Sequence, residues 1–163
     1  MKDLMNTNIY DVNETTIIVG SCTKHIEPEW FKKIEEISNN ILEICLEQTH
    51  MNMAISKICG MLRTRKIKKL IFASVDKSPH CIQLHYIQEE LRKIMDIKDI
   101  LIKNYVVVDN ELIEIKPETI SLSKNLSKLK EKMNKWSYIY IGRKYGYKRI
   151  WRNNDILFKR IKY

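Results

Sequence analysis

The strongest constraint on this chain is a pattern that occurs twice: an apolar, β-branched run followed at once by a polar loop that holds a cysteine. Thr16–Val19 leads into Gly20–His25, and Leu70–Val75 leads into Asp76–Cys81. Short apolar runs bounded by turn residues are typical of strands buried on both faces of a parallel sheet. Such strands bring their carboxyl ends to one edge, where ligands bind. We therefore expect the thiols and imidazoles of the two loops to meet in one pocket: Cys22, His25, His80 and Cys81.

Helical and strand patterns alternate along the rest of the first 134 residues. Residues 1–14 are polar and predict a loose lead-in with a short edge strand. Asp109-Asn110 predicts a tight turn between two further strands. The pattern favours a three-layer α/β fold, with a mostly parallel central sheet flanked by helices and a C-terminal antiparallel β-hairpin extension. The predicted helices cover about residues 28–45, 52–65, 78–95 and 117–134, and the later strands cover 105–108 and 112–115.

Length and charge predict one domain with a distinct C-terminal extension. The 163 residues are enough to bury a core. Residues 135–163 hold nine Lys and Arg against one Asp, whereas residues 1–134 are nearly neutral at +1. We interpret residues 1–134 as the α/β core with its lead-in. Residues 135–163 are interpreted as a basic, aromatic-rich β-hairpin extension of the same domain.

Cysteine usage and hydropathy favour the cytoplasm. The chain has four cysteines, at 22, 45, 59 and 81, and no CxxC pair. Its N-terminus lacks the apolar segment of a secretory signal, so reduced thiols are expected. No apolar run approaches the ~20 residues that cross a bilayer, so no membrane partner is expected. The four glycines, at 20, 60, 142 and 146, match neither a GxGxxG nor a Walker A loop.

The start of the predicted helix at Ser78 gives Cys81 a chemical context. With Ser78 as N-cap and Pro79 at the first helical position, Cys81 falls in the first turn. The positive end of the helix dipole is expected there to lower the pKa of the thiol and favour thiolate. Cys45 and Cys59, on apolar helical faces, are expected to be structural.

Ligand spacing suggests a metal as one use of the predicted pocket. Cys22 and His25 are separated by two residues, and Cys81 and His85 lie four apart on one helix face. Together they would form a Cys₂His₂ site for zinc, or the mixed ligands of an iron–sulfur centre.

A reactive thiol is the alternative use of the same pocket. Cys81 or Cys22 would act as nucleophile or redox thiol beside His80, with Asp76 orienting a histidine. Ser78 at the helix start and Lys24 would hold a small anion such as phosphate. Whether the chain is an enzyme is left open by these residues.

The C-terminal segment predicts a different class of function. Residues 137–141 and 147–151 read as a hairpin around Gly142–Gly146, and 156–161 as a further strand. Cations neutralise phosphates and exposed aromatic rings stack on unpaired bases, so a non-enzymatic protein that binds single-stranded RNA or DNA is the alternative. The hairpin edge also offers a homodimer surface. The residues expected to contact nucleic acid are Tyr138, Tyr140, Arg143, Lys144, Lys148, Arg149 and Arg152.

Overall fold

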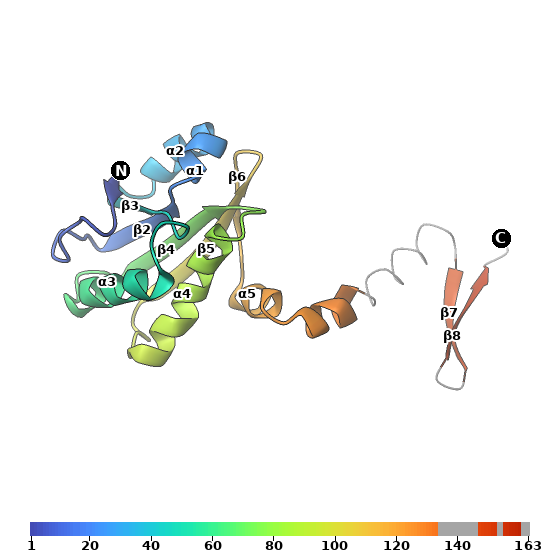
Figure 1. Cartoon of the computed structure of the whole chain (residues 1–163). Coiled ribbons are helices and arrows are strands. Elements are labelled where there is room, and N and C mark those ends of the chain that lie inside the picture. The colour runs from blue at the N-terminus through green and yellow to red at the C-terminus, as the bar shows by residue number, and fades with distance from the viewer. Residues whose placement is uncertain (134–146, 153–154, 161–163) are drawn as a thin grey trace. The chain divides into compact units, whose positions relative to one another are not determined.

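The computed structural model describes residues 1–133, 147–152 and 155–160 (Figure 1). The chain divides into two compact units, Met1–Ile120 and Ser121–Tyr163. The first unit contains the sheet and both predicted cysteine loops. No helix within the described ranges is both long and apolar enough to cross a membrane.

A six-stranded, mostly parallel sheet forms the centre of the first unit. Its strand order is β1-β3-β2-β4-β5-β6, and all neighbours are parallel except β5 and β6. The edge strand β1 corresponds to the short strand predicted within residues 1–14. The strands are β1 (Lys2–Asp3), β2 (Thr15–Gly20), β3 (Ile41–Ile44), β4 (Lys69–Val75), β5 (Leu101–Val108) and β6 (Glu111–Glu114).

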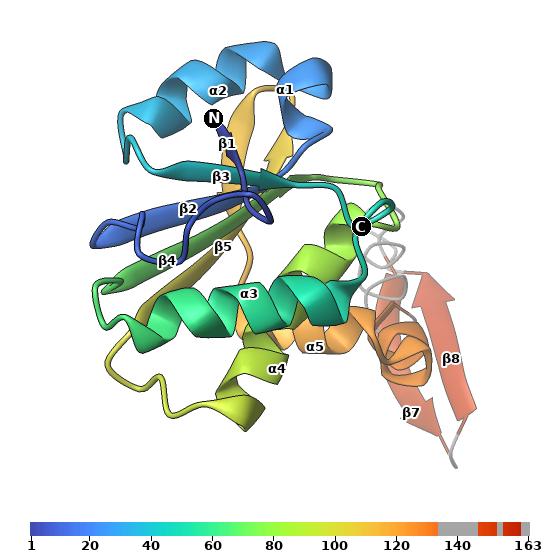
Figure 2. The same cartoon turned by 60° about the vertical axis from the view of Figure 1, so that its left-hand side comes forward.

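Helices cover both faces of this sheet, which confirms the predicted three-layer α/β class (Figure 2). The chain passes from β2 to β3 through two helices on one face. The connections from β3 to β4 and from β4 to β5 each contain one helix on the opposite face. The helices are α1 (Thr23–Ile26), α2 (Pro28–Glu35), α3 (Met51–Arg63), α4 (Cys81–Ile94) and α5 (Pro117–Ser123).

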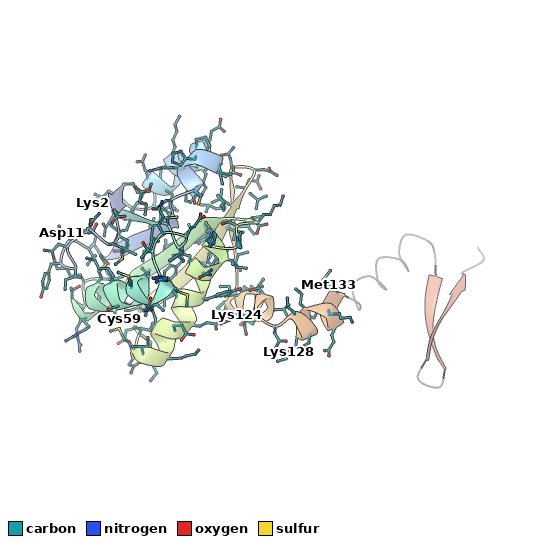
Figure 3. All side chains as sticks on the ribbon, viewed as in Figure 1. Lys2, Asp11, Cys59, Lys124, Lys128 and Met133 are labelled. Atoms are coloured by element: carbon teal, nitrogen blue, oxygen red, sulfur yellow. The ribbon has the colours of Figure 1, made fainter. Side chains whose placement is uncertain are left out.

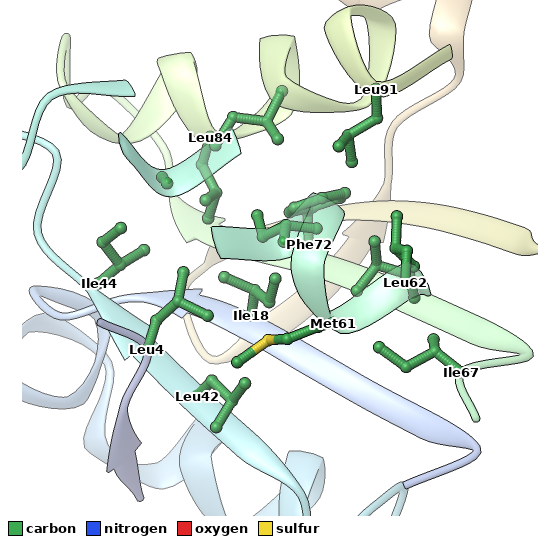
Figure 4. Packing of buried hydrophobic residues seen from close by; sticks show 14 of the residues in the cluster. Leu4, Ile18, Leu42, Ile44, Met61, Leu62, Ile67, Phe72, Leu84 and Leu91 are labelled. Atoms are coloured by element: carbon green, nitrogen blue, oxygen red, sulfur yellow. The ribbon is translucent and has the colours of Figure 1, made fainter. Parts of the chain in front are cut away.

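Alternation along the strands divides the core into two layers. In β2, Ile18 packs with the α3 and α4 side, whereas Ile17 and Val19 pack on the α2 side. In β4, Phe72 faces the first layer and Ile71 the second. Figure 4 shows the first layer, in which Leu84 and Leu91 of α4 meet Phe72 and Ile18. Burial on both faces explains why these strands read as continuous apolar runs.

The helix predicted over residues 28–45 is wrong in its second half. α2 ends at Glu35, and Ile41–Ile44 is the strand β3. Ile34, Ile37, Ile41 and Ile44 recur at intervals that also suit a helix, so the spacing alone misled. Ile41, Leu42 and Ile44 are buried, as expected of a strand between β1 and β2. Cys45 consequently follows a strand and does not lie on a helix face.

The turn predicted at Asp109-Asn110 is confirmed and has a structural partner. Both residues have positive φ, 51° and 59°, as a two-residue turn between antiparallel strands requires. The Asn110 side chain accepts a hydrogen bond from the Trp30 N–H at 3.2 Å. In return, Glu27 accepts one from the Asn110 N–H at 2.8 Å. The turn therefore caps the first turn of α2, although about 80 residues separate them.

The second unit contains a helical stretch and a strand pair. The helix predicted from Pro117 is interrupted at residues 124–125 and resumes over 126–133. β7 (Tyr147–Arg152) pairs antiparallel with β8 (Asp155–Arg160), the further strand predicted over 156–161. The first predicted hairpin strand, 137–141, and its turn lie outside the described residues.

Candidate thiol site

Two thiols meet at the point where the connections of the sheet change direction. The chain leaves β2 toward α1 over one face, and it leaves the neighbouring β4 toward α4 over the other. Ligands of open α/β sheets bind in the crevice at such a switch point. Cys22 follows β2 and Cys81 begins α4, and their Sγ atoms lie 3.8 Å apart. The juxtaposition expected from parallel strand directions is confirmed for these two residues.

Gly20, the last residue of β2, leaves the space that Cys81 occupies. A Cβ placed on Gly20 would lie 3.1 Å from the Cys81 Sγ, tighter than ordinary contacts of this kind. Cys81 is 6% exposed, and Cys22 is half-buried. The pair therefore has a sheltered member and an accessible one.

Ser78 fixes the start of α4 and the place of Cys81. Its Oγ accepts a hydrogen bond from the Cys81 N–H at 3.2 Å, and its carbonyl accepts one from Ile82 N–H. These bonds tie Ser78 to the start of α4, but the N-cap of that helix is His80, so the helix begins at Cys81, two residues later than the sequence predicts. Lys77, just before Ser78, has a φ of 64°, a backbone conformation that is uncommon for residues other than glycine.

The expectation that Cys81 favours thiolate is overturned by its burial. Desolvation is the largest effect and raises the pKa of Cys81 to about 11. The Ser78 hydroxyl acts in the opposite direction, and the neighbouring thiols Cys22 and Cys45 raise the pKa further. At neutral pH the thiol is therefore protonated. The position in the first helical turn does not compensate for the loss of water.

Cys45 is a third thiol near the pair that the sequence assigned to packing alone. It directly follows Ile44, whose register partner is Gly20, and the Ser21 N–H donates to the Ile44 carbonyl at 2.9 Å. The loop with Cys22 is thus held against the end of β3. Because the sequence predicted a helix over residues 28–45, the strand β3 was missed, and with it the position of Cys45 at the end of that strand.

His85 belongs to a buried polar network. Its Nδ1 donates to Asn104 Oδ1 at 3.1 Å, which assigns the ring proton and leaves Nε2 to accept from Ser74 Oγ at 2.8 Å. All three residues are 3% exposed or less. Burial lowers the pKa of His85 despite the bond to Asn104. Both ring nitrogens are therefore engaged, and the imidazole joins α4 to β4 and β5.

The other residues predicted for the site lie at its rim or further away. His25 is exposed on α1. Asp76 is also exposed, and it makes no hydrogen bond to a histidine within the described residues. His80 Nδ1 lies 3.8 Å from a Glu47 carboxylate oxygen. Lys24 pairs with Glu43 at 3.0 Å, so its ammonium already has an anionic partner.

The predicted metal ligands are not gathered into one set. Within residues 1–133 and the two described strands beyond, no group of three or more His, Cys, Asp or Glu could hold a metal ion. Of the four predicted ligands, the structure brings together only Cys22 and Cys81. His25 is exposed on α1, and His85 is bonded within the buried polar network.

The polar residues that complete the surroundings were missed by sequence reasoning. Ser74 and Asn104 lie inside apolar strands, and Thr23 lies next to Cys22 at the start of α1. A lone polar residue within a buried strand is the signal that could have identified the first two, because such a group needs a buried partner. Nothing in the sequence distinguished Thr23 from an ordinary loop residue.

Comparison with known families agrees with this architecture. A family model described as a Rossmann-like domain matches residues 12–137. The chain belongs to this family. No match was found among curated proteins or among solved structures. In this Rossmann-like domain the only glycine at the β2–α1 junction is Gly20, the last residue of β2, so the three-glycine fingerprint of dinucleotide binding is missing there.

Of the residues predicted to bind nucleic acid, Tyr138, Tyr140, Arg143 and Lys144 lie outside the described residues. Lys148, Arg149 and Arg152 lie on β7. In the register of β7 and β8, Arg149 is opposite Phe158, whereas Lys148 is opposite Lys159 and Arg152 is opposite Asp155.

Proposed function

We propose that this Rossmann-like domain takes part in thiol–disulfide exchange through Cys22 and Cys81. The observation that carries the proposal is the 3.8 Å separation of two sulfurs whose residues are 59 positions apart. A disulfide requires ~2.05 Å between the sulfurs, so a side-chain adjustment of under about 2 Å would form one. The location at the switch point of the sheet supports a functional use of the pair.

The different exposure of the two thiols suggests their roles. Cys22 is half-buried, so a small disulfide can reach it, whereas Cys81 is buried and its raised pKa keeps it protonated at rest. Attack by the accessible thiol followed by resolution from the sheltered one is the order that this asymmetry supports. The order reverses the emphasis of the sequence, which favoured Cys81 as the reactive thiolate.

The reaction balances with a low-molecular-weight disulfide as the oxidant. The Cys22 thiolate attacks one sulfur of R–S–S–R, forms a mixed disulfide and releases R–S⁻. Cys81 gives its proton to solvent and attacks the Cys22 sulfur, which forms the internal disulfide and releases the second R–S⁻. The two protein thiols are oxidised and the small disulfide is reduced to two thiols.

Titration with an aromatic disulfide that releases a coloured thiolate tests the proposal. Wild-type protein is expected to release two equivalents from the pair and retain no label, and mass spectrometry is expected to find a Cys22–Cys81 cross-link. Cys81→Ser should instead hold a stable label on Cys22. Cys59→Ser is the matched control, since Cys59 lies on α3 (Figure 3) and should leave the cross-link unchanged. A wild-type protein that keeps the label on Cys22 would refute the proposal.

Metal analysis of the same anaerobically purified sample tests the predicted zinc or iron–sulfur centre. Two thiolates bound to one tetrahedral zinc at ~2.3 Å would lie about 3.8 Å apart, so the geometry of the pair suits a shared ion as well. Stoichiometric metal released when the thiols are blocked would replace the redox assignment with a ligand role.

The register of β7 and β8 favours a second candidate, binding of single-stranded nucleic acid. Opposite residues of an antiparallel pair share a face, and alternate residues along each strand do so too. One face thus combines three aromatic and two arginine positions with no acidic one: Tyr147, Arg149, Trp151, Ile156, Phe158 and Arg160. Cations together with stacking rings are what an unpaired strand requires.

A shift assay with a single-stranded oligonucleotide at several salt concentrations tests this second candidate. Arg149→Ala and Trp151→Ala are expected to weaken binding by about tenfold each, because each removes a phosphate or a stacking contact. Lys148→Ala on the other face is the matched control. Equal losses in all three variants would contradict a face-specific contact.

A further inference from the structure

The hydroxyl of Thr23 is buried without a hydrogen-bond partner. Thr23 is 0% exposed, and its Oγ1 makes no hydrogen bond within the described residues. Buried hydroxyls almost always have partners, because leaving one unsatisfied forfeits its bonds to water. Such an exception beside a candidate site suggests a partner that is present in only one state of the protein.

The position of this hydroxyl connects it to Cys81. The point where a Gly20 Cβ would stand lies 3.8 Å from Thr23 Oγ1 and 3.1 Å from Cys81 Sγ. The hydroxyl and the sulfur therefore flank the same small space, which exists because residue 20 has no side chain. α1 fixes Thr23, whose carbonyl accepts from the Glu27 N–H at 2.9 Å.

Opening a Cys22–Cys81 disulfide leaves a negative charge on the Cys81 sulfur, which requires a hydrogen-bond donor beside it. An outside thiolate attacks the accessible Cys22 sulfur and forms a mixed disulfide with it. The bond between the two protein sulfurs breaks, and its electron pair passes to Cys81 Sγ. A negative charge thus appears on a buried sulfur, where burial disfavours it and the nearby Cys45 thiol adds to the penalty. Among these neighbours, the Ser78 hydroxyl favours the charge.

We propose that the Thr23 hydroxyl donates a hydrogen bond to Cys81 Sγ as the disulfide opens, and so stabilises the departing thiolate. This inference rests on the proposed exchange function. A donor fixed in place before the charge develops contributes most in a water-poor site, because nothing needs to reorganise. The bond has no use in the resting dithiol, whose sulfur is neutral, which accounts for the orphaned hydroxyl.

Stopped-flow reduction of the preformed internal disulfide by dithiothreitol tests the inference. Thr23→Val replaces the hydroxyl with a methyl group of similar size, and it is expected to slow opening at least about tenfold. Thr23→Ser keeps the hydroxyl and should open at nearly the wild-type rate. The rate of Cys81 alkylation can be measured against pH by quantifying the modified peptide that contains Cys81. The pKa obtained in this way should be higher than in wild type for Thr23→Val and equal to wild type for Thr23→Ser.

Stability separates this role from a structural one. Removing an unsatisfied buried hydroxyl should leave the dithiol form of Thr23→Val as stable as wild type or more so, whereas a structural bond would make it less stable. Equal opening rates in all three proteins, with the disulfide formed in each, would overturn the Thr23 assignment and leave the exchange function standing. Failure of the wild-type disulfide to form would overturn both.

Discussion

The Cys81 thiol holds its proton more tightly in the folded protein than in the unfolded chain. Its pKa rises from 9.0 to about 11, so between these values the native state keeps a proton that the unfolded chain releases. The contribution to stability is complete below pH 9 and is lost as pH rises toward 11. We expect the free energy of unfolding of the reduced protein to fall over this range, and to fall less in Cys81→Ser. Urea unfolding at a series of alkaline pH values measures both slopes, and identical slopes would contradict the assignment.

The buried imidazole of His85 gives the opposite dependence at acid pH. Burial lowers its pKa below 6.5, so the unfolded chain binds a proton that the native state excludes. Stability is therefore present above about pH 6.5 and is lost as pH falls through the lowered pKa. We expect wild type to lose stability on acidification toward pH 5, and His85→Gln to lose less over the same range.

An exposed histidine provides the control for this acid dependence. His50 is exposed just before α3, so His50→Gln should follow the wild-type pH profile of urea unfolding. A shallower profile in His50→Gln, or an unchanged one in His85→Gln, would assign the acid sensitivity to other groups.

At this scale the sequence predicted which residues meet better than what their surroundings do to them. The approach of Cys22 and Cys81 follows from strand direction, which apolar runs and flanking loops reveal. The sign of the Cys81 pKa shift depends on how closely β2 and α4 pack, and that depends on Gly20. His85 lies on α4 and its partners lie on the strands β4 and β5, so no local spacing could identify them.

Among the elements, the short helix α2 depends on a turn distant in sequence. Its N-cap, Glu27, makes no side-chain cap bond, and the Asn110 side chain accepts from the Trp30 N–H instead. Asn110 also adopts a φ of 59°, which asparagine tolerates better than alanine. One residue thus joins the β5–β6 turn to the start of a helix on the face that carries α1 and Cys22.

Two substitutions at Asn110 separate the cap from the backbone conformation. Asn110→Gly removes the cap and keeps the turn, so it should lower the free energy of unfolding by about 1 kcal/mol. Asn110→Ala also forces alanine into the left-handed region and should cost about 2 kcal/mol in total. Denaturant unfolding measures both, with Asp109→Gly as a nearly neutral control in the same turn. Equal losses for glycine and alanine would show that φ contributes nothing.

The strand β3 shows where pattern reading fails for an element. Four isoleucines at intervals of three or four residues satisfy a helical period, yet residues 36–40 separate α2 from a four-residue strand. What decides between the two states is the presence of β1 and β2 on either side, a long-range effect that propensity does not contain. The parallel strands β2 and β4 were predictable because their apolar runs are continuous and bounded by turns.

At the scale of the whole molecule, oxidation of the thiol pair would close a long loop. The residues lie 59 positions apart, and in the chain-entropy description a cross-link of this length stabilises the native state by about 4 kcal/mol. We expect the oxidised protein to unfold at a clearly higher urea concentration than the reduced one. Cys22→Ser should show no difference between oxidising and reducing buffers, and an equal midpoint for both wild-type forms would contradict the prediction.

The segment between the two cysteines contains a helix from each side of the sheet, α2 on one and α3 on the other. A disulfide across the ends of this segment would therefore restrict the helical layers on both faces of the sheet at the same time. Lifetime against proteases would then depend on the redox potential of the surroundings, with the oxidised chain persisting longest.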